Sequence, residues 1–168
     1  MLALGGVLLG ISGASAATYY LMTQGERDTH AVWHDIVVPI KNAGCGVNQE
    51  GSWTGDITEL YRLGIISRDV AEADIAPLKP LVDKPRPYHG YFVVAMDSGP
   101  GDDGWTPVSV KGNLRSSSWG VCVFPATADR PDLPVILICS GGIHTRASEG
   151  NKPILSWPKE RSGWAIAR

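Results

Sequence analysis

Apolar and small residues fill the first 22 positions of this chain, and no charged side chain occurs before Glu26. An α-helix rises about 1.5 Å per residue, so about 20 such residues cross the roughly 30 Å hydrocarbon core of a bilayer. This pattern predicts a transmembrane anchor helix over residues 1–24. We therefore expect the protein to work at a membrane.

Small residues recur along this segment at a spacing that favours helix pairing in membranes: Gly6, Gly10, Gly13 and Ala17. A neighbouring helix backbone can approach closely along a face without large side chains. Tyr19 and Tyr20 follow at the depth where amphipathic rings meet the lipid headgroups. We therefore expect the membrane itself and other transmembrane subunits as partners.

A cleaved signal peptide is the alternative interpretation of the same segment. Ala14-Ser15-Ala16 has the small-x-small form that signal peptidase cuts, but no Lys or Arg precedes the apolar run, as it does in a standard signal. Retention of the segment is therefore the favoured hypothesis. Cleavage would instead leave an exported protein with a polar cleft holding His89, His144 or Ser140.

Apolar positions between Thr29 and Asn42 follow at helical spacing, which predicts a helix that continues from the anchor or restarts after it. Pro39 lacks a backbone N–H and should kink or end this helix. Gly44-Cys45-Gly46 then breaks the pattern. Residues 25–50 are therefore expected to form a juxtamembrane helix and a linker.

Two shorter helices are predicted next. Residues 56–63 form an amphipathic pattern, with Thr54 or Asp56 as the N-cap and Gly64 as the stop. Residues 67–76 carry a second, shorter apolar stripe.

The rest of the chain alternates turn signals with strand-like apolar runs. Strands are expected at residues 90–97, 106–110, 119–125, 135–139 and 143–146. Ser140-Gly141-Gly142 suits a hairpin between the last two. Prolines between residues 76 and 87 favour an extended tract over the domain surface. Helices first and an antiparallel sheet after predict an α+β fold, with residues 51–168 as an extracytoplasmic domain.

Composition and charge narrow the range of partners. The net charge is −2 and no block of Lys or Arg is present, so nucleic acid is excluded as a main partner. The chain holds 20 Gly, 12 Pro and 6 Trp, with only 19% charged residues. These proportions indicate a loop-rich domain with aromatic-lined surfaces.

None of the three cysteines, Cys45, Cys122 and Cys139, belongs to a C-x-x-C pair, so neither a structural zinc site nor a thioredoxin-type motif is indicated. Cys122 and Cys139 lie in strand-like runs, where they either form a disulfide in an oxidising compartment or remain buried thiols. The disulfide alternative and the Trp-, Gly- and Pro-rich composition favour a domain outside the cytoplasm. We expect a bacterial inner-membrane protein with its main domain in the periplasm.

Candidate chemical groups are few. His30 and His34 share one helix face and can supply two metal ligands, but two ligands do not complete a site, and interfacial histidines are the favoured interpretation. Ser140 stands in Cys-Ser-Gly-Gly rather than G-x-S-x-G, which a hairpin turn explains. Asp102 and Asp103 lack the spacing of an EF-hand calcium loop. We therefore expect neither catalysis nor a bound cofactor or metal.

Aromatic side chains are the remaining candidates for contact with partner proteins, because Trp and Tyr are enriched at interfaces. The docking candidates are Trp33, Trp53, Tyr88, Tyr91, Trp157 and Trp164.

After the apolar N-terminal helix, Gly51-Ser52-Trp53 precedes a short helix ending in Leu60-Tyr61-Arg62-Leu63-Gly64-Ile65-Ile66, and Tyr88-His89-Gly90-Tyr91 opens the strands. In this order of motifs the chain resembles pilin-like and pseudopilin-like extracytoplasmic proteins. The resemblance implies a small non-enzymatic building block held by its N-terminal helix in a larger assembly. The chain departs from it by lacking a basic-Gly-Phe-type processing site and by carrying Gly5 where pilins usually carry Glu.

Together these observations predict a non-catalytic, single-pass membrane subunit that stabilises or scaffolds a larger membrane complex, with a respiratory or photosynthetic complex as one host. A pilin-like filament or secretion-system subunit is a second version of the same class. An exported enzyme or ligand-binding protein with a cleaved signal is the rival hypothesis from a different class.

Overall fold

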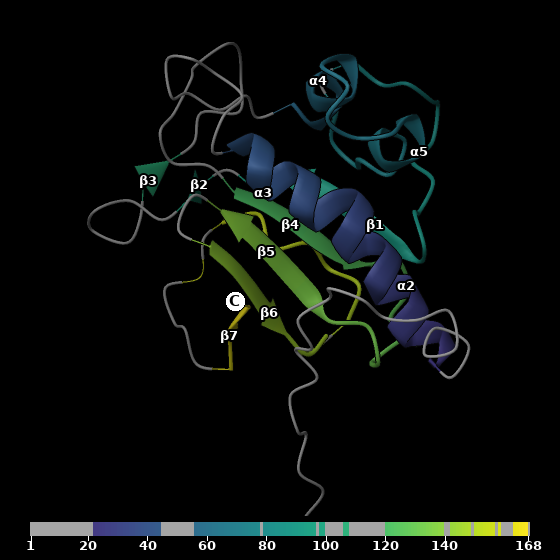
Figure 1. Cartoon of the computed structure of the whole chain (residues 1–168), viewed down its shortest axis with the longest axis vertical. Helices are drawn as coiled ribbons and strands as arrows, with labels where there is room; N and C mark the ends of the chain where they lie inside the picture. The colour runs from purple at the N-terminus through teal and green to yellow at the C-terminus, as the bar shows by residue number, and fades with distance from the viewer. Residues whose placement is uncertain are drawn as a thin grey trace, which may run out of the picture.

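Short helices and an antiparallel sheet make up the part of the chain that the computed structural model describes (Figure 1). The described residues are 22–44, 56–77, 79–96, 98–99, 106–107, 120–139, 142–148, 150–156, 158 and 163–167. The predictions that lie outside them concern Gly6, Gly10, Gly13, Ala17, Tyr19, Tyr20, Cys45, Trp53, Ser140 and Trp157. The anchor over residues 1–24 therefore stays a prediction. Among the described residues, no helix has both the length and the apolarity to cross a membrane.

The first helical run passes from α2 (Gln24–Val32) through one π-helical turn, η1 (Trp33–Val37), into α3 (Val38–Gly44). It begins at a capping box, in which the Thr23 hydroxyl accepts from the N–H of Glu26 at 3.2 Å and the Glu26 carboxylate accepts from the N–H of Thr23 at 2.6 Å. The apolar spacing alone predicted a helix from Thr29, whereas the observed helix begins earlier, at Gln24. Its first residue is the last residue of the predicted anchor.

Pro39 was expected to kink or end this helix, and it does not end it, because α3 continues to Gly44. A proline ring collides with the carbonyl four residues earlier in a regular α-helix, here that of Asp35. The π-helical turn lies directly before it, and the N–H of Val38 bonds to the carbonyl of Trp33. This wider turn accommodates the proline, as such turns often do where a helix is locally disrupted.

The helix α4 (Ile57–Arg62) has the ends that the sequence predicts. The Asp56 side chain accepts from the N–H of Thr58, and Gly64 follows with a φ of +73°. The N–H of Gly64 bonds to the carbonyl of Tyr61, and that of Ile65 bonds to the carbonyl of Leu60. This pair of bonds is a Schellman motif, which needs the left-handed conformation that glycine adopts without strain.

The helix α5 (Arg68–Ala71) is shorter than the predicted stretch of residues 67–76. Residues 73–75 instead run parallel to the sheet edge, where the N–H of Val93 bonds to Ala73 and the N–H of Ile75 bonds to Val93. Backbone groups that bond to the sheet cannot also bond within a helix, so α5 ends early.

The main sheet is antiparallel, in the order β1-β4-β5-β6-β7. Its strands are β1 (Tyr91–Ala95), β4 (Gly120–Pro125), β5 (Val135–Cys139), β6 (Gly142–Arg146) and β7 (Ala165–Ala167). A two-stranded ribbon joins β2 (Ser98–Gly99) to β3 (Thr106–Pro107). The sequence predicted all of these except β2 and β7, and the α+β class is confirmed. β7 is too short, at three residues, to show a periodic pattern.

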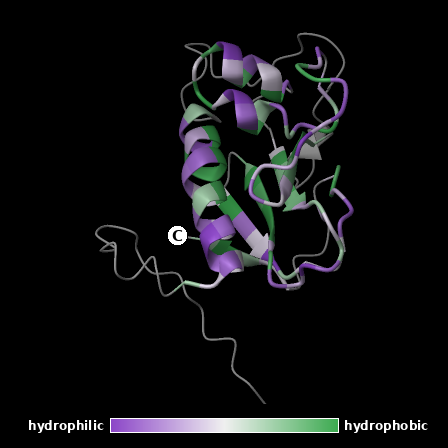
Figure 2. Cartoon of the chain, turned by 90° about the vertical axis from the view of Figure 1, so that its right-hand side faces the viewer, coloured by the Kyte–Doolittle hydropathy of each residue, from purple (hydrophilic) through white to green (hydrophobic). Residues whose placement is uncertain are grey.

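Both faces of the sheet are covered, which explains why β4 and β5 read as unbroken apolar runs. The long helix packs on one face through fully buried residues such as Val32, Ile36 and Ile40 (Figure 2). On the other face, Ile154 and Trp164 from the C-terminal segment pack against a second cluster. The helix over residues 24–44 therefore shares its core with the sheet, rather than standing between an anchor and a domain.

Cys122 and Cys139 are buried and form no disulfide with each other, so the disulfide alternative was wrong. In the β4–β5 register, Cys122 pairs with Leu137 and Cys139 pairs with Gly120, which makes the two cysteines diagonal neighbours. Diagonal side chains lie about 7–8 Å apart, whereas a disulfide needs about 4 Å between Cβ atoms. The two thiols act as small apolar residues of the second cluster.

Candidate functional site

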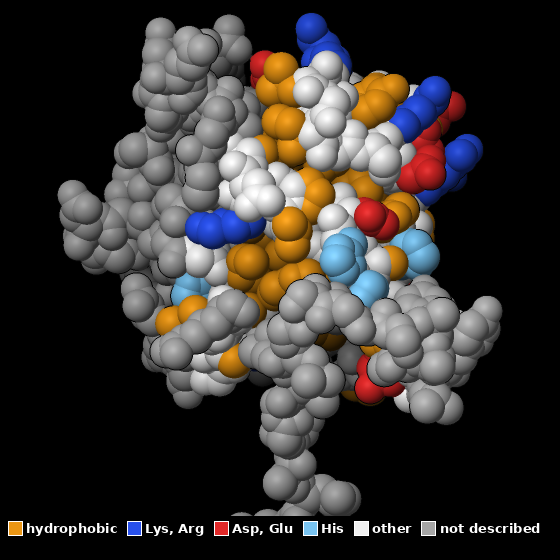
Figure 3. Space-filling view, in the orientation of Figure 1, with side chains coloured by type: hydrophobic (Ala, Val, Ile, Leu, Met, Phe, Trp, Pro, Cys, Tyr) orange, Lys and Arg blue, Asp and Glu red, His pale blue; other side chains and the backbone are white. Residues whose placement is uncertain are grey.

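Polar residues concentrate where the N-terminal part of α2 meets the turn before β1 and the loop between β4 and β5. We call this place the α2 corner and define it by Asp28, Tyr88, His89, Arg130 and Asp132. Histidine side chains gather over the long helix on the same face of the molecule (Figure 3). Of these five residues, the sequence analysis singled out Tyr88 and His89.

A tight turn positions Tyr88 and His89. The backbone N–H groups of Tyr88 and Tyr91 each bond to the carbonyl of the other, at 2.8 and 2.9 Å. Between them, His89 and Gly90 have φ values of +47° and +78°. Positive φ at both central residues is the mark of a type I′ turn, and His89 is the only residue other than glycine with a positive φ in the described part of the chain.

Asp28 is the centre of the corner and is only 6% exposed. Its carboxylate accepts a 2.7 Å hydrogen bond from the Gln24 amide, and Arg130 Nη2 lies 3.4 Å from its second oxygen. His89 Nδ1 lies 3.6 Å from the first oxygen. A buried carboxylate with three polar neighbours from three segments holds these segments together and is not available as a general base.

Arg130 joins this carboxylate to a second one. Its guanidinium forms a fork onto Asp132, with Nε at 2.9 Å from one oxygen and Nη2 at 2.8 Å from the other. The Arg130 hydrogen bonds hold the pKa of Asp132 below its usual value, and Asp132 raises the pKa of Arg130. Gly25 of α2 leaves room for the fork, because a Cβ at that position would collide with the Asp132 carboxylate.

Tyr88 makes a second link between the turn and the long helix. Its hydroxyl donates a 2.5 Å hydrogen bond to Asp35 of η1. Partial burial, together with this hydrogen bond to a carboxylate, raises the pKa of Tyr88. The hydroxyl groups of Tyr91 and Thr29 lie 3.2 Å apart beneath it. The turn is therefore attached to the helix at several points along its length.

His30 and His34 lie together, as their spacing predicts, with ring centroids 4.6 Å apart. His34 is exposed, and His30 is partly buried. Among the described residues, no group of three or more His, Cys, Asp or Glu side chains is arranged to hold a metal ion.

The docking candidates that the structure describes differ in exposure. Tyr91 is fully buried as the first residue of β1, so its side chain is not available to a partner. Trp33 and Tyr88 are partly buried against the main core. Trp164 packs on the second cluster, with the Arg146 guanidinium 4.9 Å from its ring centroid.

The polar cleft expected of an exported enzyme does not form between His89 and His144. His89 precedes β1, whereas His144 lies on β6, three strand positions away and about 14 Å across the sheet. His144 also pairs with Leu137, a residue of the second cluster, and so lies on the face opposite the long helix.

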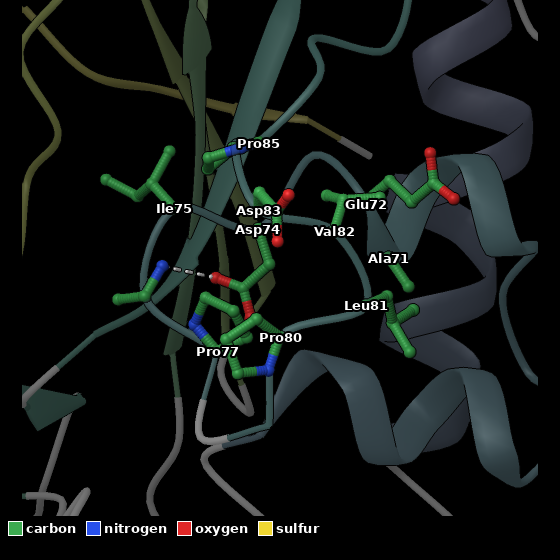
Figure 4. A pocket seen from close by; sticks show the side chains of 11 residues that line it. Ala71, Glu72, Asp74, Ile75, Pro77, Pro80, Leu81, Val82, Asp83 and Pro85 are labelled. Carbon is green, nitrogen blue, oxygen red and sulfur yellow. Dashed lines mark hydrogen bonds between the residues drawn. The ribbon is translucent and has the colours of Figure 1, made fainter.

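A cavity of about 260 Å³ lies beside α5 and was not anticipated (Figure 4). It contains Asp74, a carboxyl group that is only 3% exposed. Burial, together with the nearby charge of Asp56, raises the pKa of Asp74 to about 7. The sequence holds no local signal for this site, because an aspartate in a short helical pattern looks like a solvated residue.

No family model, no curated protein and no solved structure matches the chain.

Proposed function

We propose that this chain is a non-catalytic, single-pass membrane subunit whose α+β domain stabilises a larger membrane complex. The observation that carries the proposal is the position of the long helix. It starts at Thr23, directly after the apolar segment, and its residues Val32, Ile36 and Ile40 are fully buried against the sheet. A partner that holds the first 22 residues in a membrane would therefore also hold the folded domain.

The capping box at Thr23 favours a scaffold subunit over a pilin-like filament subunit. The resemblance to pilin-like proteins implies a helix that runs from the membrane into the head. Thr23 instead has an extended backbone, with φ −64° and ψ 164°, so a membrane helix before it and α2 after it are two separate helices. Such a joint lets the domain take its own orientation against a neighbouring subunit.

The α2 corner is the favoured docking surface of this domain. Asp28 follows Thr23 by five residues, or about 8 Å along the helix axis, so the corner lies at the end of the domain nearest the anchor. His89 is exposed there and Tyr88 is partly buried, which supports contact with a partner protein. The polar groups within the corner bond to one another, which supports binding rather than catalysis.

We place the domain on the periplasmic side of a bacterial inner membrane. The Trp-, Gly- and Pro-rich composition supports this side. The two buried thiols do not add support, because they lie too far apart to form a disulfide, which would need an oxidising compartment. Protease digestion of spheroplasts would test it: we expect the domain to be cleaved from outside, and full protection would contradict this orientation.

Gentle detergent extraction of native membranes, followed by native gel separation and intact-mass analysis, tests the function itself. We expect the full chain of 18.0 kDa in a large particle with its partner subunits. A trimmed, soluble monomer would overturn the proposal and favour the exported protein with a cleaved signal.

A further inference from the structure

The cavity beside α5, which we call the Asp74 cavity, is built from two segments that are close in sequence. Its lining residues lie within residues 71–77 and residues 80–85 (Figure 4). Pairing of residues 73–75 with the edge of β1 fixes the position of Asp74. The backbone beside the cavity is therefore held in place by pairing with the sheet. The cavity lies outside the α2 corner, and a ligand there is independent of the proposed membrane function.

Among the described residues, none donates a hydrogen bond to one of the two oxygens of the Asp74 carboxyl group. Oδ1 accepts from the N–H of Ala76 at 3.0 Å. In the part of the chain that the structure describes, Oδ2 has no such partner, and Figure 4 shows the carboxyl group beside the rings of Pro77 and Pro80. Proline has no N–H to donate, so these walls cannot satisfy the second oxygen.

Most of the other residues that line the cavity have apolar side chains. Ile75, Leu81 and Val82 contribute hydrocarbon side chains. The Glu72 carboxylate, at 8% exposure of the residue, is already engaged by Arg68 at 2.8 Å and by Arg86 at 3.6 Å. Asp74 is therefore the acidic group of the cavity that is buried and still able to accept a ligand.

We propose that the Asp74 cavity binds a small organic cation, with an ammonium group donating to the second oxygen of Asp74 and an apolar body against the proline walls. A buried carboxylate is costly unless it is paired, and an ammonium group supplies both the charge and the donor. At about 260 Å³, the cavity lies below the usual range of roughly 300–1,000 Å³ for ligand pockets, so the cation is small. A free amine and the lysine side chain of a partner protein share this chemistry.

Titration of the full-length protein in detergent with n-butylammonium chloride at pH 8, followed by amide NMR, tests the proposal. We expect saturable shifts of the amides of residues 72–76 and of Val93, with a dissociation constant on the order of 1 mM. The neutral isostere 1-butanol should cause at least tenfold weaker shifts. Equal binding of 1-butanol, or no saturable shift with butylammonium, would overturn the proposal.

Asp74→Asn provides the matched variant, because its amide oxygen can still accept from Ala76 while the charge is lost. We expect at least tenfold weaker butylammonium binding in Asp74→Asn and less than a threefold change in Asp83→Asn, at an exposed position on the rim. Equal losses in the two variants would contradict a specific role for Asp74. Nα-acetyl-lysine-N-methylamide distinguishes the sources: binding of this probe indicates a partner's lysine, and binding of butylammonium alone indicates a free amine.

Discussion

His89 Nδ1 lies 3.6 Å from the Asp28 carboxylate, which joins the turn before β1 to the second turn of α2. Arg130 approaches the other oxygen of the same carboxylate from the β4–β5 loop. One buried side chain thus links three segments that are distant in the sequence. The long helix is held to the sheet by this polar contact at its N-terminal end and by apolar packing along the rest of its length.

Asp28→Ala should therefore destabilise the domain. The substitution removes the acceptor of the Gln24 amide and the buried one of the two carboxylates that the Arg130 guanidinium contacts. We expect a loss of about 1–3 kcal/mol in the free energy of unfolding, measured by urea denaturation. Asp132→Ala is the matched control: it removes an exposed partner of the same Arg130 and should cost less than about 1 kcal/mol. Equal losses would show that burial of Asp28 is unimportant.

The effect of Gly25→Ala on the stability of the domain should depend on the side chain at position 132. Replacing a helical glycine by alanine usually stabilises a helix by roughly 0.5–1 kcal/mol. Here the new Cβ meets the Asp132 carboxylate, so we expect no gain, or a loss of up to about 1 kcal/mol, in the free energy of unfolding. In an Asp132→Ala background the usual gain should return. A double-mutant cycle measures this coupling, and strict additivity would contradict the predicted close approach.

The features that the sequence predicted well depend on neighbouring residues. Asp56 as a cap and Gly64 as a stop follow from backbone rules that operate within one turn of a helix. The runs that became β4 and β5 are buried on both sides, and their continuous apolar character was sufficient to locate them. Local chemistry was enough in these cases.

The features that the sequence did not predict depend on distant residues. Ala73 and Ile75 leave their helical pattern because Val93 offers backbone bonds at a sheet edge. The same pairing buries Asp74, and strand burial removes Tyr91 from the surface. The α2 corner likewise arises from three distant segments, although His89 beside Gly90 was a local sign of a tight turn. Pairing over such separations leaves no periodic pattern.

Asp74→Asn should change how stability depends on pH. The pKa of Asp74 is about 7 in the folded protein, against 3.8 as its ordinary value, so the folded state binds this proton more tightly than the unfolded state. Wild-type stability should therefore fall as the pH rises from about 4 to 7, by up to about 4 kcal/mol from this group. The asparagine variant lacks that loss and should be the more stable protein at pH 8.

Urea denaturation of both proteins at pH 5 and pH 8 measures this difference. The stability advantage of Asp74→Asn should be larger at pH 8 than at pH 5 by about 2–3 kcal/mol, while Asp83→Asn should follow the wild type at both values because its carboxyl group is exposed. A difference between wild type and Asp74→Asn that does not change with pH would contradict the raised pKa.

Gly10→Leu tests whether the predicted anchor pairs with a neighbouring helix. In a helix, Gly10 would share one face with Gly6, Gly13 and Ala17, and a leucine there would hold the partner backbone away. We expect at least a fivefold loss of co-purification with partner subunits in gentle detergent. Ser12→Leu, about 130° away from that face, introduces the same leucine side chain and should change co-purification less than twofold. Membrane fractionation of both variants ensures that insertion is unaffected, and equal co-purification of the two would refute the packing face.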